Sequence, residues 1–261
     1  MGKTIKKTIV VAVIAMSIPL CMKWLSAVGY YFSDKGEQAS SPLEFSLKGT
    51  TVEVVGFKKG QNKETVIIPE KAICCGYLCT VTSIGRGAFS GCSGMTSVKI
   101  PLSVTEIGDY AFYRCSGLTS VEIPTSVTEI GRGAFFGCSG LTSVEIPSSV
   151  KKIRHEAFYG CSGLTSVEIP SSVKKISYRV FEGCIGLTSM EMPLSVTEID
   201  CRAFYGCVGL TSVEIPSSVT EIGDETFKNC YNLNIVIDNT KNNVKVGERT
   251  FERCKSVKWK K

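Results

Sequence analysis

The stretch Cys138–Ile153, CSGLTSVEIPSSVKKI, occurs a second time without change at Cys161–Ile176, at an offset of 23 residues. The same interval runs far beyond these two copies. Self-similarity at a fixed interval of this size is the sequence signature of a repeat architecture. The most regular positions are a phenylalanine and the cysteine three residues after it, at Phe89 and Cys92, Phe112 and Cys115, Phe135 and Cys138, Phe158 and Cys161, Phe181 and Cys184, Phe204 and Cys207, Phe227 and Cys230, and, one residue late, Phe251 and Cys254.

One repeat unit is Leu118–Gly140, LTSVEIPTSVTEIGRGAFFGCSG. Its first residues, Leu118–Ile123, alternate apolar and polar side chains at their end, which predicts a short strand. Pro124 ends this strand because proline cannot donate a hydrogen bond to a ladder. Residues 127–130 form a second extended segment with Val and Ile inward. Residues 134–138 then predict a short helical or 3₁₀ turn that covers the core.

A single unit of this kind cannot bury its apolar side, whereas stacked units can, and the expected fold is a solenoid. The pattern L-x-x-V-x-I-P-x-x-V-x-x-I-G-x-x-A-F-x-x-C resembles the BspA-like, or TpLRR-class, leucine-rich repeat. The resemblance covers Ile84 to Cys254, in seven regular copies and one irregular copy. It implies a β-rich, horseshoe-like leucine-rich-repeat solenoid in which short strands are joined by short helical or 3₁₀ turns.

The resemblance also implies a function. Members of this family are often bacterial surface proteins, and some are adhesins toward host extracellular-matrix proteins. The expected function is therefore non-enzymatic binding of a protein or glycan partner by an exported protein at the cell surface, in the periplasm or in the medium. Two alternatives stay open: a structural module of the cell envelope that self-associates as a homo-oligomer, and, more remotely, a thiol-dependent enzyme.

The chain divides into five expected segments. Residues 1–29 combine a basic start, an apolar run and small residues, which predicts a signal peptide or an uncleaved anchor. Residues 30–44 predict a flexible stem, because Ser33–Pro42 is polar. Residues 45–68 predict an N-terminal β cap, 69–254 the solenoid, and 255–261 a C-terminal cap. Contact with a membrane is expected only through the leader, if it is retained.

The net charge of +6 belongs mostly to that leader. Lys3, Lys6, Lys7 and Lys23 all precede the first acidic residue, Asp34. They are four of the 30 basic residues, and the remaining 26 face 24 acidic residues. A nucleic-acid partner is therefore not expected, because such proteins concentrate basic residues in their folded domain. The sequence contains no metal or phosphate motif, and no cofactor is expected.

The cysteines suggest two different roles. Because the repeated cysteines occupy equivalent positions, they are interpreted as buried thiols that fill the core. Disulfides or a metal along that column are the alternatives. Nine extra residues lie between Pro69 and Ile84 compared with later copies, and they contain three further cysteines in an expected loop. A disulfide from Cys79 to Cys74 or Cys75 is the candidate in an exported protein.

Three sets of solvent-facing positions are candidate binding residues, because packing does not require their side chains. The first is an acidic stripe, at Glu122, Glu145, Glu168, Glu191 and Glu214. The second is the aromatic position after the repeated phenylalanine, at Tyr113, Phe136, Tyr159 and Tyr205, interrupted by Glu182. The third is a basic patch in two adjacent copies, at Lys151, Lys152, Lys174 and Lys175. Each set has a plain alternative, namely solubility, packing between turns and a solvated face, respectively.

Overall fold

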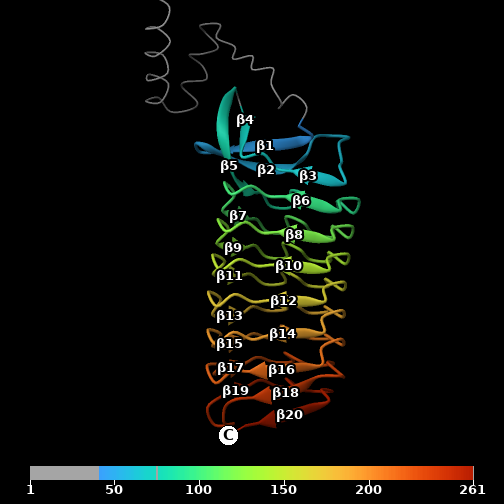
Figure 1. Ribbon diagram of the computed structural model, residues 1–261, viewed down its shortest axis with the longest axis vertical. Coiled ribbons are helices and arrows are strands. Elements are labelled where there is room, and N and C mark those ends of the chain that lie inside the picture. The colour runs from blue at the N-terminus through green and yellow to red at the C-terminus, as the bar shows by residue number, and fades with distance from the viewer. Residues whose placement is uncertain (1–40, 75, 261) are drawn as a thin grey trace, which may run out of the picture.

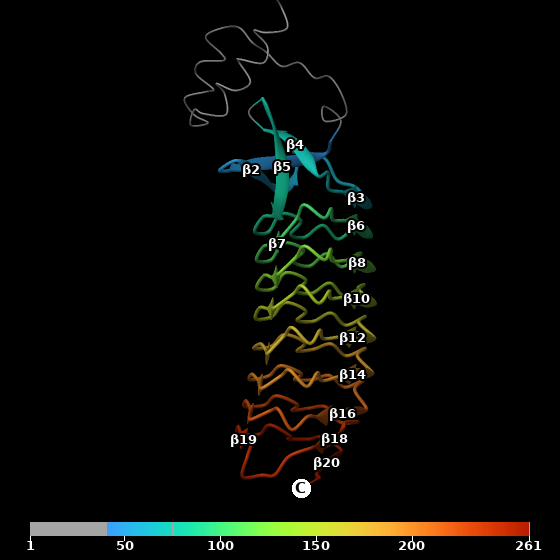
Figure 2. The same cartoon turned by 60° about the vertical axis from the view of Figure 1, so that its left-hand side comes forward.

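The structure is a computed structural model that describes residues 41–74 and 76–260. The chain winds into a β-solenoid in which each 23-residue repeat makes one turn and the turns stack along one axis (Figure 1). Each turn places one short strand on each of two sides of the solenoid, and Figure 2 shows both columns from the side. The predicted leucine-rich-repeat solenoid is confirmed. The predicted leader and most of the stem lie outside the described residues.

One side of the solenoid is a single nine-stranded sheet in which every strand is parallel to its neighbours. Its order is β20-β18-β16-β14-β12-β10-β8-β6-β3. The strands are β3 (Thr65–Ile67), β6 (Ser97–Lys99), β8 (Ser120–Glu122), β10 (Ser143–Glu145), β12 (Ser166–Glu168), β14 (Ser189–Glu191), β16 (Ser212–Ile215), β18 (Asn234–Ile237) and β20 (Ser256–Trp259). This sheet carries the acidic stripe.

The second column of strands is divided into two sheets. The first has the order β1-β2-β5-β7-β9-β11, with β4 paired to β5, and the second has the order β13-β15-β17-β19. Their strands are β1 (Leu43–Lys48), β2 (Thr51–Phe57), β4 (Lys71–Cys74), β5 (Tyr77–Ile84), β7 (Glu106–Ile107), β9 (Glu129–Ile130), β11 (Lys152–Ile153), β13 (Lys175–Ile176), β15 (Glu198–Ile199), β17 (Glu221–Ile222) and β19 (Lys245–Val246). The division falls between the two lysine pairs.

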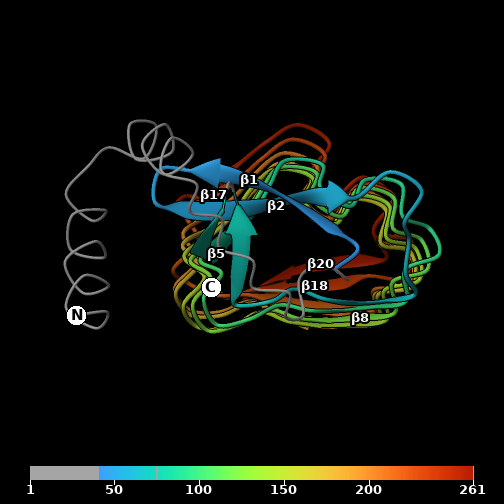
Figure 3. The same ribbon diagram turned by 90° about the horizontal axis from the view of Figure 1, so that it is seen from above.

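The N-terminal end of the solenoid is covered by antiparallel strands (Figure 3). β1 and β2 form a hairpin around Gly49, and β2 continues into the solenoid by pairing in parallel with β5. The insertion expected as a loop is instead a second hairpin, made of β4 and β5. Gly76 provides its turn, with a φ of 82° that favours glycine. β3 pairs with β6 and so belongs to the nine-stranded sheet.

The core is built from columns of identical side chains. The repeated phenylalanine rings from Phe89 to Phe227 are fully buried and lie nearly parallel, with centroids 5.2 to 5.6 Å apart and planes within 16° of each other. Offset stacking at this separation is favourable for aromatic rings. Columns of leucine, valine and isoleucine fill the space between the phenylalanines and the sheets. Each turn is therefore stabilised by its neighbours.

The segments that contain these phenylalanines are hydrogen-bonded turns, and no helix occurs in residues 41–74 and 76–260. The expectation of short helical or 3₁₀ turns is therefore corrected: these segments are turns without helix. Each turn holds a left-handed residue two positions before and two positions after its phenylalanine. Around Phe112 these are Tyr110, with φ 57°, and Arg114, with φ 55°. Left-handed residues interrupt a right-handed helix, and here the backbone instead bonds to the next turn, as from Phe112 N to Ala134 O at 2.8 Å. Among the described residues, no helix is long and apolar enough to cross a membrane.

Candidate functional site

The acidic stripe runs along the exposed face of the nine-stranded sheet. The register pairs Glu122 with Glu145, and Glu168 with Glu191, so their side chains stand at the same height on neighbouring strands. All are exposed. Lys260 forms an ion pair with Glu214, but no cation of residues 41–74 and 76–260 lies within ion-pair distance of the other four glutamates. Most of the stripe is therefore a row of like charges without internal compensation, which costs stability in a sheet.

The backbone around the stripe is held in place by threonines. The hydroxyl of Thr142 donates to the carbonyl oxygen of Thr119 at 3.1 Å, and that of Thr165 donates to Thr142 at 3.2 Å. The same bond recurs in neighbouring turns. These bonds supplement the sheet ladder at the edge of each strand. The face that carries the glutamates is consequently a regular surface on rigid elements, as a binding site requires.

A groove lies where the N-terminal part of this face meets the repeated prolines. It has a volume of about 660 Å³ and is lined by residues of β3, β6, β8 and β10 and of the segments after them. Its walls include Ile67 and Leu102, which are 67% and 65% exposed. Glu122 and Glu145 also line it. The groove therefore combines exposed apolar surface with two carboxylates. Lys99, which lies opposite Glu122 on β6, also lines the groove but is not within ion-pair distance of either carboxylate.

The aromatic position after the repeated phenylalanine is used mainly for packing. Phe136 stacks on Tyr159 with centroids 4.4 Å apart, and its other face contacts Tyr113 at 5.1 Å. All three are half-buried. Tyr205 lies beyond the interruption at Glu182, and its hydroxyl accepts a hydrogen bond from Asn229 at 3.0 Å. These contacts explain the aromatic character of the position without a partner, although the half-exposed edges stay available to one.

Glu182 replaces an aromatic residue in that column and is buried. Its burial raises the pKa of its carboxyl, and Arg179, 3.2 Å away, opposes the shift. A buried carboxylate needs such a partner to remain charged. The sequence marked the interruption at Glu182 but not the ion pair with Arg179, because the pairing depends on how the side chains fold within one turn.

The four lysines of the basic patch are exposed and lie on two adjacent turns, at β11 and β13. Lys175 forms ion pairs with Glu198 at 2.5 Å and with Asp200 at 3.2 Å. Within residues 41–74 and 76–260, Lys151, Lys152 and Lys174 have no carboxylate within ion-pair distance. The structure thus brings the patch together but neutralises only one of its members.

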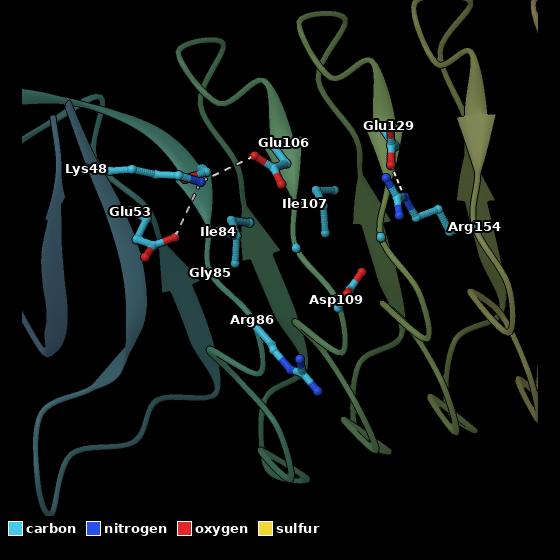
Figure 4. Close-up of a pocket in the computed structure, with 13 residues that line it drawn as sticks. Lys48, Glu53, Ile84, Gly85, Arg86, Glu106, Ile107, Asp109, Glu129 and Arg154 are labelled. Carbon is cyan, nitrogen blue, oxygen red and sulfur yellow. Dashed lines mark hydrogen bonds and ion pairs between the residues drawn. The ribbon is translucent and has the colours of Figure 1, made fainter. Parts of the chain in front are cut away.

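A polar pocket that the sequence did not indicate lies beside the N-terminal cap (Figure 4). It has a volume of about 270 Å³. Lys48 approaches Glu106 at 3.6 Å and Glu53 at 4.0 Å, and Arg154 pairs with Glu129. Most charges around the pocket are therefore compensated by each other. Its small size and internal pairing distinguish it from the groove.

The repeated cysteines are structural. From Cys115 to Cys230 they are fully buried and form no disulfide. Each thiol points at the carbonyl oxygen of a phenylalanine in the preceding turn, as from Cys161 Sγ to Phe135 O at 3.1 Å. Burial raises the pKa of Cys161 and of Cys230 to about 12. Thiols held in this protonated state are poor nucleophiles, so the geometry gives no support to a thiol enzyme.

Two cysteines of the insertion lie in the β4–β5 hairpin, Cys74 on β4 and Cys79 on β5. The register places Cys79 opposite Ala72 and Cys74 opposite Tyr77, so Cys74 and Cys79 are diagonal neighbours rather than a direct pair. Diagonal positions are farther apart than a disulfide normally allows. Cys75 lies outside the described residues, and the bridge from Cys79 to Cys75 remains a prediction. Within the described ranges, no group of three or more histidine, cysteine or acidic residues is placed to hold a metal ion.

Comparison with known proteins agrees with this architecture. The family model described as BspA type leucine rich repeat region (6 copies) matches residues 57–188 and 151–259. The chain belongs to this family. The BspA-type repeat thus accounts for the solenoid from the end of β2 to β20. A comparison with curated proteins finds no match.

Three solved structures illustrate the relationship. A leucine rich cell surface protein from Faecalibacterium prausnitzii is 37% identical, with a TM-score of 0.70, over 76% of this chain and 53% of that one. A leucine-rich repeat protein from Bacteroides ovatus is 28% identical, with a TM-score of 0.60, over 84% and 75%. The T. pallidum leucine rich repeat protein is 28% identical, with a TM-score of 0.55, over 79% and 83%. The chain therefore spans about half of the Faecalibacterium protein.

Proposed function

We propose that this BspA-type protein is an exported, non-enzymatic binding module that attaches to a protein partner, in adhesion to host or matrix components. The observation that carries the proposal is the groove beside the acidic stripe. There Ile67 and Leu102 offer apolar surface next to Glu122 and Glu145, neither of which has a cation of the described residues within ion-pair distance. Exposed apolar surface rimmed by polar groups is typical of protein-interaction sites.

The chemistry of the groove defines the partner. A segment with an apolar side chain and a neighbouring lysine or arginine fits it, because burial of the apolar group supplies affinity and the cation offsets the repulsion along the stripe. The description of the Faecalibacterium relative as a cell surface protein supports export. The basic, apolar N-terminal segment of this chain supports it independently.

The test is a binding screen of the full chain against immobilised fibronectin, laminin and collagen, followed by surface plasmon resonance. We expect saturable binding that weakens as salt is raised, because part of the attraction is electrostatic. The variant Leu102→Ser should bind more weakly. Absence of saturable binding to all three proteins would contradict the adhesion proposal while leaving the fold intact.

Self-assembly is the second candidate, and one observation favours it. β20 is the last strand in the order of the nine-stranded sheet, so one of its edges is open in the described structure. Its residues Val257 and Trp259 are only half-buried. Open strand edges are templates for pairing with another chain. A monomeric mass at high protein concentration in light scattering would eliminate this candidate.

A further inference from the structure

The two lysine pairs mark the place where the second column of strands is interrupted. β11 is the last strand of one sheet and β13 the first strand of the next. Elsewhere in this column, from β7 to β17, the amide just before each strand bonds to the preceding turn. Examples are Lys151 N to Thr128 O and Thr197 N to Lys174 O, each at 2.9 Å. Within residues 41–74 and 76–260, Lys174 N has no such backbone acceptor.

The same interruption is repeated three residues later. Arg154 N bonds to Ile130 O at 3.0 Å, and Asp200 N bonds to Ile176 O at 2.8 Å. The amide of Ser177, at the equivalent place between them, has no backbone acceptor among the described residues, and Ile153 O instead accepts from the hydroxyl of Ser177. Two backbone hydrogen bonds that join the other turns are thus missing at this junction, and the Ser177 hydroxyl replaces one of them.

The gap is local, because the same two turns remain joined elsewhere. In the nine-stranded sheet Val144 pairs with Val167, and in the phenylalanine turns Phe158 N bonds to Val180 O at 3.0 Å. Ser177 stands where several other turns have glycine, but this replacement does not by itself explain the missing bonds. A side chain at this position does oppose close stacking, since a Cβ at the equivalent Gly131 would lie 2.5 Å from the backbone of Gly108.

Asp200, however, carries a side chain at the position equivalent to Ser177, and its amide still bonds to the preceding turn. What the junction between β11 and β13 adds is two lysines stacked on two lysines. Stacked glutamates occur in neighbouring turns without such a break, but there cations offset them, as Arg154 offsets Glu129 and Lys175 offsets Glu198. Like charges directly opposite each other destabilise a ladder.

The acidic neighbours of the patch are already engaged. The register places Lys152 opposite Glu129, but the carboxylate of Glu129 pairs with Arg154. Glu198 and Asp200, on the other side, pair with Lys175. Lys151, Lys152 and Lys174 are therefore left as three exposed ammonium groups without an acidic partner among the described residues.

We propose that Lys151, Lys152 and Lys174, at the junction between β11 and β13, bind the sulfate groups of a sulfated glycan. Clustered lysines without acidic partners attract polyanions electrostatically. A linear sulfated glycan brings several sulfates, and the lysines of two turns can contact more than one of them. The site lies on the opposite column of strands from the acidic stripe, so it is separate from the proposed protein-binding face (Figure 1).

The first test is a sulfate titration of the full chain followed by NMR at constant ionic strength. The probe is sodium sulfate, with sodium chloride as the matched salt. The amide resonances of Lys174 and Ser177 should shift in a saturable way. Those of Thr197 and Asp200, their equivalents one turn later, should not shift, since that turn has threonine and glutamate in place of a lysine pair. Equal shifts at both turns, or none, would overturn the proposal.

The second test measures binding of heparin, a densely sulfated glycan, to the full chain. Lys151→Gln, Lys152→Gln and Lys174→Gln together should weaken binding about tenfold or more and reduce its salt dependence, since fewer counterions are released. The control Lys58→Gln, Lys59→Gln and Lys63→Gln removes three exposed lysines elsewhere and should retain most of the affinity. Equal losses in both variants, or tighter binding to a DNA duplex of matched charge, would refute a sulfated-glycan site. Binding to matrix proteins through the acidic face should persist in both variants.

Discussion

Glu122 and Glu145 stand directly opposite each other on β8 and β10, and both line the groove at the N-terminal end of the sheet. No cation of the described residues is within ion-pair distance of either one. Nearby, the repeat places Leu102 where most other turns have serine or threonine. The concentration of apolar and acidic side chains around one groove distinguishes this part of the face from the rest of the stripe.

Leu102 offers a test of the groove with a matched control. Leu194 occupies the equivalent position four turns later, is 78% exposed and does not line the groove. Leu102→Ser should weaken binding to a matrix protein, because an apolar contact is lost, whereas Leu194→Ser should not. Neither should change the urea midpoint appreciably, since both side chains are exposed. Equal effects of the two substitutions on affinity would argue against the groove.

The buried phenylalanine column should dominate stability. Phe158→Ala removes a fully buried ring that stacks on both neighbours, and we expect a loss of about 3–5 kcal/mol in the free energy of unfolding. Phe136→Ala, in the half-buried outer stack, should cost distinctly less. Denaturant titration followed by circular dichroism measures both. Similar losses would mean that the outer stack shares the role of the core.

The buried thiols predict loss of stability in alkali. In the unfolded chain Cys161 and Cys230 ionise near their ordinary pKa of 9.0, whereas burial raises the pKa of each to about 12 in the folded chain. Between these values the unfolded state binds fewer protons, so the free energy of unfolding falls as pH rises, by up to about 1.4 kcal/mol per pH unit for each thiol. Below pH 9 the thiols are protonated in both states, so the free energy of unfolding does not fall on their account.

Urea titrations under reducing conditions from pH 8 to 11 measure this slope. Cys161→Ala should make it shallower by the share of one thiol, while Cys201→Ala, at a half-exposed position outside the column, serves as the control. A slope that is unchanged in Cys161→Ala would contradict the assignment of the effect to the buried column.

The lysine junction predicts that removal of one charge stabilises the fold. Lys174→Thr introduces the residue that occupies this position in most other turns and removes a like charge from the two stacked lysine pairs. We expect the free energy of unfolding to rise by about 0.2–1 kcal/mol, because like charges on neighbouring strands destabilise a sheet. Hydrogen exchange at Ser177 should slow at the same time. No change in either quantity would mean that charge repulsion does not hold this edge open.

The repeat made most of the fold predictable. A fixed interval places Phe135 over Phe112 and Val144 beside Val121 without any knowledge of the turns between them. The turn conformation was not predictable in the same way, because left-handed residues are usually glycine, and here Tyr110, Arg114 and others adopt that conformation. The stacked turns fix it through bonds between neighbours, which no single turn contains.

The candidate site was predictable only in part. The exposure of the acidic stripe and of the lysines follows from strand alternation. The position of the groove does not follow from alternation. It depends on the pairing of β3 with β6 across the inserted β4–β5 hairpin, which brings Ile67 and Leu102 to the same groove. The ion pairs that neutralise Lys175 but not Lys152 also depend on side-chain positions across turns.

The most direct test of the central claim, that the acidic face binds a protein partner, is the affinity of a triple variant for the matrix protein that the wild-type chain binds. Glu122→Gln, Glu145→Gln and Glu168→Gln remove three charges of the stripe. If each contributes about 0.5 kcal/mol, surface plasmon resonance should show roughly a tenfold loss of affinity. The control Glu44→Gln, Glu64→Gln and Glu248→Gln, which changes exposed glutamates outside the stripe, should bind like the wild-type chain. Unchanged affinity in the stripe variant, or an equal loss in the control, would contradict the account.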